Sequence, residues 1–208
     1  MYVPPHFDET RLDEIHRLVG RYPLGILVFN RPDGLDANHL PFELDVAEGH
    51  PGFLRAHVAR ANPLWTETKG GDEVLVIFRA ADAYVSPNWY PSKHEFHRQV
   101  PTWNYQVVHI HGRIRIRDDP RYVRGVVARL TRTHEARTEP ANPWRMGDSP
   151  PDYIDRMLEA IVGIEIEITR IAGKSKLSQN KEERDRRGAA EALRTRGQSA
   201  MSDAMLDR

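Results

Sequence analysis

The sequence predicts a mainly β fold with peripheral helices, in which about six antiparallel strands close into a small barrel or pack as a sandwich. Three observations predict it. Short apolar or alternating segments recur at close spacing, turn residues separate them, and helical periodicity is confined to a few inserted segments. Close spacing of the early strands favours antiparallel hairpins over a doubly wound parallel sheet. Periodicity alone does not separate a barrel from a sandwich.

The first part of the chain predicts one helix and two strands. Residues 8–19 carry an apolar stripe at helical spacing, with Asp8 as a candidate N-cap. Residues 24–29 predict a buried strand, and Arg31-Pro32-Asp33-Gly34 has the composition of a turn. Residues 39–46 predict the returning strand, followed by a second turn over residues 48–52.

The middle of the chain predicts three more strands around a long loop. Residues 53–59 alternate, and residues 73–78 are apolar and β-branched, as in a central strand. Residues 104–116 alternate most clearly, with apolar side chains on one face and histidines and arginines on the other. Residues 86–102 contain three prolines and predict a long irregular loop, a kind of segment that is usually functional.

Two helices and a last strand are predicted next. Asp119 can cap a helix that has Pro120 in its first turn, and Ser149-Pro150 starts a second helix in the same way. Residues 163–171 alternate again and predict the final strand. Asn180-Lys181-Glu182-Glu183 resembles a capping box that opens a charged helix.

We therefore predict two parts. Residues 1–179 form the β domain with its inserted helices, and residues 180–208 form a charged C-terminal helix and tail. The tail helix is only weakly apolar, so it could dock on a partner or fray.

The composition sets limits on the partners. Among the 208 residues, 30 Lys and Arg balance 30 Asp and Glu, which argues against a whole-molecule attraction to nucleic acid. Arg129, Arg132 and Arg137 give the helix after Pro120 a basic side, so DNA binding stays open. The alternative is a solvated helix face, because no helix-turn-helix pattern accompanies these arginines.

The chain contains no cysteine, which excludes disulfides, thiolate metal sites and a cysteine nucleophile. The N-terminus lacks the pattern of a signal peptide. No stretch approaches the ~20 apolar residues that span a membrane. We therefore expect a cytoplasmic protein without a membrane partner.

No strong catalytic signature is present, but polar clusters stand at strand ends and loops. In residues 57–65, Arg60 and Asn62 beside Trp65 could hold a phosphate and a ring. The alternative is a turn with a packed tryptophan. Residues 86–93 and 100–105 combine aromatic rings with short polar side chains, which suits a planar heterocycle. The alternative is a loop that buries its own aromatic rings.

A third cluster covers residues 173–180. It combines two cations, two hydroxyls and backbone N–H groups ahead of a helix start, which is a credible anion site. The alternative is a solvated basic loop.

The histidines do not predict a metal site. His109 and His111 lie two apart on one strand face, but no third ligand follows at a fixed spacing. His57 lies on another strand, where a histidine is more often structural than a ligand.

Together, these motifs resemble the PaiB-like family of FMN-binding negative transcriptional regulators. The matching segments run in order along nearly the whole chain, at residues 1–7, 22–25, 38–42, 57–63, 84–90, 100–105 and 174–180. One departure from the family pattern is Arg79-Ala80-Ala81-Asp82, where Gly-Pro would form a turn.

The resemblance implies a homodimer of antiparallel six-stranded split β-barrels, similar to flavin reductases and pyridoxamine oxidases, with FMN at the interface. The motif positions that it makes candidates for phosphate and ribityl contacts are Arg60, Asn62, Lys174, Lys176, Ser178 and Gln179. Those that it makes candidates for the isoalloxazine environment are Trp89, Trp103 and Asn104. His57 and Thr102 complete the implied cofactor-binding set.

The resemblance implies more than one function. A negative transcriptional regulator would have DNA as its partner. The alternative is a redox enzyme that uses FMN or heme b, because relatives include heme-dependent piperazate synthases. In the heme case, the candidate axial ligands are His57, His109 and His111. A cofactor-free interaction module is the third alternative.

Overall fold

The computed structural model describes residues 1–47 and 50–207, except for the side chains of residues 47 and 50. The strands are β1 (Asp8–Glu9), β2 (Leu24–Arg31), β3 (Gly34–Pro41), β4 (Glu43–Ala47), β5 (His50–Ala59), β6 (Glu73–Val85), β7 (Thr102–Arg117) and β8 (Ile161–Lys176). They form a mainly antiparallel sheet in the order β3-β2-β6-β7-β8-β5-β4, and β1 pairs with β8.

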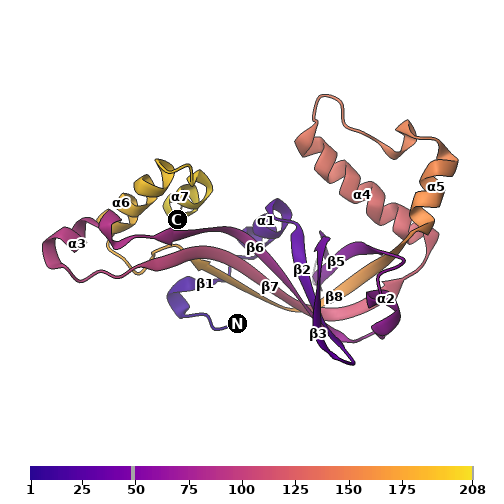
Figure 1. Ribbon diagram of the computed structural model, residues 1–208, viewed down its shortest axis with the longest axis horizontal. Helices are drawn as coiled ribbons and strands as arrows, with labels where there is room; N and C mark the ends of the chain where they lie inside the picture. Colours follow the sequence, from indigo (N-terminus) through magenta and orange to yellow (C-terminus); the bar gives the residue numbers. More distant parts are fainter. Residues whose placement is uncertain (48–49, 208) are drawn as a thin grey trace. The chain divides into compact units, whose positions relative to one another are not determined.

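Helices connect and flank these strands (Figure 1). They are α1 (Leu12–Arg21), α2 (Leu64–Glu67), α3 (Pro91–Phe96), α4 (Pro120–Thr138), α5 (Pro151–Glu159), α6 (Glu183–Arg194) and α7 (Ser199–Leu206), with short 3₁₀ turns η1 (Pro5–Phe7), η2 (Pro87–Trp89) and η3 (Met146–Asp148). No helix in the described part of the chain combines the length and apolarity needed to cross a membrane.

The chain forms two compact units. Unit 1 comprises residues 1–18, 79–108 and 172–208, and unit 2 comprises residues 19–78 and 109–171. The two C-terminal helices thus share unit 1 with the chain's first residues. The predicted domain division at residue 179 stays a prediction.

Unit 2 is built around the pairing of β5 with β8. The register joins Leu54 to Ile166 and Val58 to Val162, and all four side chains are buried. Gly112 of β7 is required here, because a Cβ at this position would lie 2.5 Å from the Glu167 carbonyl oxygen. The alternating apolar faces predicted for the middle and final strands are therefore the faces that form this core.

The hairpin of β2 and β3 in unit 2 confirms the turn predicted at residues 31–34. Arg31 pairs with Gly34 across the turn, and Gly34 has φ 131°, a value that favours glycine. The helix predicted after Asp119 is confirmed as α4, and the Asp119 carboxylate accepts a hydrogen bond of 2.7 Å from the Tyr122 backbone N–H. This turn and this cap were predictable from the residues next to them in the sequence.

Unit 1 has its own apolar core, in which α6 and α7 pack. Its buried side chains are Ala83, Val85, Tyr90, Leu177, Ala189, Ala190, Leu193, Met201 and Met205. Helix α6 lies close to η2, since a Cβ at Gly188 would be 2.6 Å from the Trp89 carbonyl oxygen. The C-terminal helices are thus part of this unit's core.

Several predicted boundaries were wrong. The described residues hold eight strands rather than about six, because residues 39–46 divide between β3 and β4 and because Asp8–Glu9 forms β1. Asp8 therefore pairs with Lys174 in the sheet instead of capping a helix, and α1 begins at Leu12. Residues 79–82, where the chain departs from the Gly-Pro turn of the family pattern, lie within β6. Of the turn predicted at 48–52, residues 48–49 lie outside the described residues.

Two further corrections concern unit 1. The loop predicted for residues 86–102 contains η2 and α3. The capping box at residues 180–183 is not formed, because α6 begins at Glu183 with Glu182 as an N-cap that makes no side-chain capping bond.

The packing of α6 gives a first test. Leu193 is 1% exposed, so Leu193→Ala should lower the free energy of unfolding by about 2–5 kcal/mol through the cavity it leaves. Leu206→Ala is the matched control, because Leu206 is 37% exposed and its loss should cost less than about 1 kcal/mol. Chemical denaturation followed by circular dichroism measures both. Equally small losses would contradict the packing of α6 in unit 1.

Candidate functional site

The structure distributes the predicted site residues over both units. His57, Arg60 and Asn62 belong to unit 2. The others belong to unit 1: Trp89, Thr102, Trp103, Asn104, Lys174, Lys176, Ser178 and Gln179. Each group is described within its own unit.

Three of the lysines of unit 1 stand at the end of β8 and in the turn that follows. Lys174 and Lys176 are two apart on the strand, so they share one face while Ser175 points to the other. Ser178 then adopts a left-handed conformation with φ 64°, and the Lys181 N–H donates to the Ser178 carbonyl oxygen at 3.0 Å. This turn places a third lysine, Lys181, after the strand end.

Each of the three ammonium groups contacts neutral oxygens and aromatic rings. Lys174 is 9% exposed, donates to the Tyr2 carbonyl oxygen at 3.2 Å, and lies 5.3 Å from the centre of the Tyr105 ring. Lys176 donates to the Thr102 hydroxyl. Lys181 donates to the Gln99 amide oxygen at 2.6 Å and lies 5.2 Å from the centre of the Tyr90 ring.

No carboxylate of the described residues lies within ion-pair distance of Lys174, Lys176 or Lys181. Burial lowers the pKa of Lys176, and the charges of Lys174 and Lys181 lower it further. Lys176 is thus close enough to both other cations to be repelled by them. An ammonium can donate three hydrogen bonds, and each donates to one protein oxygen here. This donor set fits an anion, above all a phosphate.

Polar side chains around the turn after β8 form hydrogen bonds with one another and with its backbone. The Asn104 amide donates to the Ser178 hydroxyl at 2.9 Å, and both residues are buried. The Gln179 amide oxygen accepts from the Leu177 N–H at 2.7 Å, and its nitrogen donates to the Ser175 carbonyl oxygen. These bonds fix the turn after β8 and therefore position the lysines.

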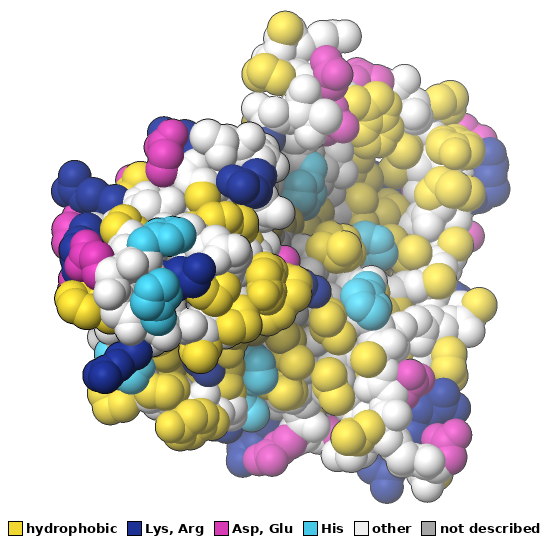
Figure 2. Space-filling model, turned by 60° about the vertical axis from the view of Figure 1, so that its left-hand side comes forward, with side chains coloured by type: hydrophobic (Ala, Val, Ile, Leu, Met, Phe, Trp, Pro, Cys, Tyr) yellow, Lys and Arg dark blue, Asp and Glu magenta, His cyan; other side chains and the backbone are white. Residues whose placement is uncertain are grey.

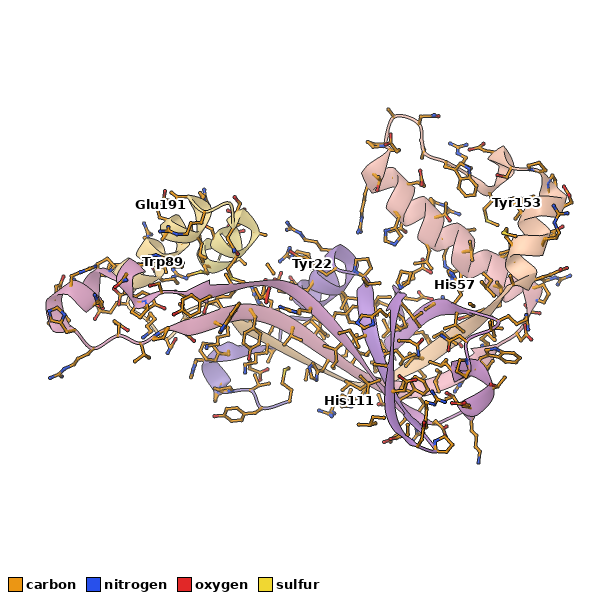
Figure 3. The ribbon with its side chains drawn as sticks, in the orientation of Figure 1. Tyr22, His57, Trp89, His111, Tyr153 and Glu191 are labelled. Carbon is orange, nitrogen blue, oxygen red and sulfur yellow. The ribbon has the colours of Figure 1, made fainter. Side chains whose placement is uncertain are left out.

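Aromatic side chains accompany this layer. Trp103 is 55% exposed and meets Tyr84 edge-on with ring centres 5.9 Å apart. Trp89 lies against α6 in Figure 3, with the Arg196 guanidinium 4.8 Å from the centre of its ring. Trp103 therefore offers an accessible ring surface, while Trp89 is engaged within unit 1.

In unit 2, Arg60 is held by a carboxylate. Its guanidinium forms a bidentate pair with Asp118 at 2.7 and 2.9 Å and donates to the Glu159 carbonyl oxygen at 2.7 Å. A cavity of about 470 Å³ lies beside this pair. Asn62 donates to the Asn38 side chain at 2.7 Å and accepts from the Leu64 N–H. Both side chains of this cluster thus have partners within the chain.

The three histidines differ in their surroundings. Burial lowers the pKa of both His57 and His109, and within the described residues their Nδ1 atoms have no hydrogen-bond partner. His111 accepts from Arg170 at 2.7 Å. Figure 3 shows His57 and His111 well apart in unit 2. No set of three or more His, Asp or Glu side chains gathers as a metal site within residues 1–47 and 50–207.

The basic face of α4 is largely engaged inside unit 2. Arg129 donates to Glu43 at 2.6 Å, and Arg137 donates to the Gly20 carbonyl oxygen at 2.6 Å. Figure 2 shows basic, acidic and apolar side chains interspersed over the visible face of the molecule. Two of the three arginines named for DNA binding, Arg129 and Arg137, thus have other contacts.

The sequence analysis missed Lys181 and its partner Gln99. A signal was available, because only five of the 30 basic residues are lysines and three of those five stand at 174, 176 and 181. In a chain whose basic residues are mostly arginine, this segment instead carries lysines, whose ammonium groups are compact point charges.

Comparison with known proteins identifies the family to which this chain belongs. A family model described as "Putative FMN-binding domain" matches residues 1–170. The chain is 31% identical over 193 residues to the "Protease synthase and sporulation protein PAI 2" of Bacillus subtilis, covering 93% of this chain and 89% of that protein. It is also 31% identical over 235 residues to an uncharacterized protein of Emericella nidulans, covering 96% and 93%.

Solved structures share the fold at low sequence identity. The FAD and heme binding protein from Mycobacterium smegmatis aligns with a TM-score of 0.57 at 16% identity, covering 81% of this chain and 73% of that one. The flavocytochrome Anf3 from Azotobacter vinelandii aligns with a TM-score of 0.58 at 12% identity, covering 84% and 72%.

The chain is thus a mainly antiparallel β protein with inserted helices, of a fold that is also found in flavin-binding proteins. It belongs to the family of FMN-binding-domain proteins defined by the matching model, and the predicted relation to PaiB-like proteins is confirmed.

The cost of holding an unpaired cation can be measured at Lys176. Its pKa is lowered from 10.5 in the folded chain, so folding penalises the charged form at every pH below that lowered value. Lys176→Met should therefore raise the midpoint of thermal unfolding at pH 7, and the difference should shrink as the pH rises through the lowered pKa toward 10.5. Lys69→Met, at an exposed position, is the matched control. A lower midpoint for Lys176→Met at pH 7 would contradict the penalty.

Proposed function

We propose that this protein binds FMN, with the phosphate held by the lysines at the end of β8. The observation that carries the proposal is the partly buried pair of cations at the end of β8. Lys174 and Lys176 are held by neutral acceptors and have no carboxylate partner in the described residues. A phosphate monoester carries about −1.5 to −2 charges at neutral pH and would relieve their mutual repulsion.

The rest of the flavin has a plausible environment in the same unit. Trp103 and Tyr84 are both about half exposed and present ring surfaces that suit a planar heterocycle. Thr102 directly precedes Trp103 in β7, and its hydroxyl accepts a hydrogen bond from Lys176. Asn104, Ser178 and Gln179 would then act mainly by fixing the turn that carries the lysines.

We further propose that the protein works as a split-barrel homodimer. Unit 1 exposes several large apolar side chains that a second copy would cover, among them Tyr84, Phe96, Val100 and Trp103. An FMN bound beside Trp103 would then lie at or near that interface. Sedimentation of the purified protein at several concentrations tests the dimer.

A bound flavin supplies electron and hydride transfer, whereas the protein binds and orients it. We therefore favour a flavin-dependent redox role in the cytoplasm, with the aromatic pair and the lysines as the binding apparatus. The regulatory role implied by the family resemblance needs DNA contacts, and Arg129 and Arg137 already have partners within unit 2. A salt-dependent, sequence-selective gel shift by the purified protein would favour the regulator instead.

Heme is the second candidate cofactor. His57 and His109 are partly buried, have a lowered pKa, and carry an unpartnered Nδ1 in the described residues, which suits a neutral imidazole ligand. Of the two solved structures of the same fold, one is named a FAD and heme binding protein and the other a flavocytochrome. A sharp Soret band on hemin addition that is lost in His57→Ala or His109→Ala would select this candidate.

The FMN proposal predicts a specific pattern of affinities. Lys174→Met and Lys176→Met should each weaken FMN binding by about 1.5–3 kcal/mol, because each removes a charge-assisted contact to phosphate. Riboflavin lacks the phosphate, so its affinity should change little. Fluorescence titration with both ligands measures this, with Lys69→Met as the matched control.

The proposal fails if the wild-type protein binds FMN no more tightly than riboflavin. If both lysine variants keep the wild-type preference for FMN over riboflavin, the assignment of Lys174 and Lys176 to the phosphate is wrong.

A further inference from the structure

We propose that Lys181 is a third cation of the phosphate site and that Asp185, acting through Gln99, is its positioning residue. The inference rests on the proposed FMN function and deepens it, because it assigns the site to a phosphate monoester dianion. Its basis is a chain of hydrogen bonds inside unit 1 that connects the buried carboxylate of Asp185 to the ammonium group of Lys181 through Gln99.

The first contact holds Lys181 itself. Its ammonium donates to the Gln99 amide oxygen at 2.6 Å and lies over the Tyr90 ring, 5.2 Å from the ring centre. Both partners are neutral, so the ammonium keeps its full charge and two further donors. Lys181 therefore resembles Lys174 and Lys176 in having a fixed position and no counter-charge among the described residues.

The second contact sets the orientation of the Gln99 amide. Its nitrogen donates to the Ser92 hydroxyl at 2.7 Å and to the Asp185 carboxylate at 3.1 Å. A carboxylate only accepts hydrogen bonds, so it requires the NH₂ end of the amide. The oxygen end is therefore turned toward Lys181.

The third contact anchors the carboxylate. Asp185 is 1% exposed, and it accepts from the Ser92 N–H at 2.9 Å and from the Ser92 hydroxyl at 2.5 Å. A buried carboxylate is costly unless hydrogen bonds satisfy it, and here Ser92 and Gln99 provide them. Because Ser92 stands in the first turn of α3 and Asp185 in the first turn of α6, the anchor ties both helices to the residue that holds Lys181.

Replacement of the carboxylate by an amide should reverse this orientation. In Asp185→Asn, the new NH₂ group would face the Gln99 NH₂ group, and two donors cannot share a hydrogen bond. The Gln99 amide should turn over to accept from Asn, which directs its own NH₂ toward the Lys181 ammonium. Lys181 would then lose its acceptor while the apolar packing of the unit is kept.

The test compares FMN with riboflavin in the intact protein by fluorescence titration. Lys181→Met should weaken FMN binding about tenfold to a hundredfold and leave riboflavin binding within about threefold, because only the phosphate contact is lost. Lys181→Arg should restore most of the FMN affinity. Lys69→Met, which removes an exposed charge in unit 2, should leave both ligands unchanged.

The positioning role is tested by a double-mutant cycle. Asp185→Asn should weaken FMN binding in the wild-type background but have little further effect in Lys181→Met, because both changes act on the same contact. Equal weakening of FMN and riboflavin, or full additivity of the two changes, would assign Asp185 a merely structural role and overturn the inference. Gln99→Met provides a second variant that breaks the chain without altering Asp185.

The two proposals can fail separately. If the wild-type protein does not prefer FMN over riboflavin, the proposed function fails and this inference falls with it. If the wild-type protein prefers FMN and Lys181→Met keeps that preference, the FMN site stands and the third cation is refuted.

Discussion

Three ammonium groups gathered without a counter-charge are the constraint on which the rest of this structure depends. Lys174, Lys176 and Lys181 each contact neutral oxygens and an aromatic ring, and no carboxylate of the described residues pairs with them. Like charges held together in a partly buried setting oppose folding unless something offsets them. The surrounding packing keeps them in place, and an anionic ligand is the natural partner for the charge that remains.

Unit 1 supplies that packing from distant parts of the sequence. The β1–β8 pairing fixes Lys174, the Asn104–Ser178 bond fixes the turn after the strand, and the apolar core of α6 and α7 holds the residues beyond it. The buried polar layer has its own hydrogen bonds, so it specifies one arrangement of the turn. Asn104 and Ser178, which the sequence analysis predicted as cofactor contacts, thus also stabilise the turn that positions the lysines.

The sequence predicted what is encoded locally. The Asp119 cap, the turn at Gly34 and the alternation of residues 104–116 depend on neighbours a few positions away, and all were recovered. The extra strand β1 and the division of residues 39–46 into two strands depend on partners far along the chain. Propensity does not report such pairings, which explains why Asp8 was taken for a helix cap.

In the candidate site, too, the sequence reveals what neighbouring residues encode and not what distant contacts decide. The family motifs place Lys174, Lys176 and Ser178 in one segment, but the Ser178 hydroxyl is held by Asn104, more than seventy residues away. The sequence did not single out Lys181, because the role that we propose for it depends on Gln99 and Asp185, which only the fold brings together. All of the cofactor-contact assignments stay predictions, both those in this unit and those of His57, Arg60 and Asn62 in the other.

The central claim is that the lysines hold a phosphate dianion, and phosphorus NMR of bound FMN tests it most directly. The second pKa of a free phosphate monoester is about 6, and nearby cations lower it. If the account is right, the ³¹P shift of protein-bound FMN stays at its dianionic value through pH 6 and below, whereas free FMN titrates there. A bound phosphate that titrates like free FMN would contradict the account.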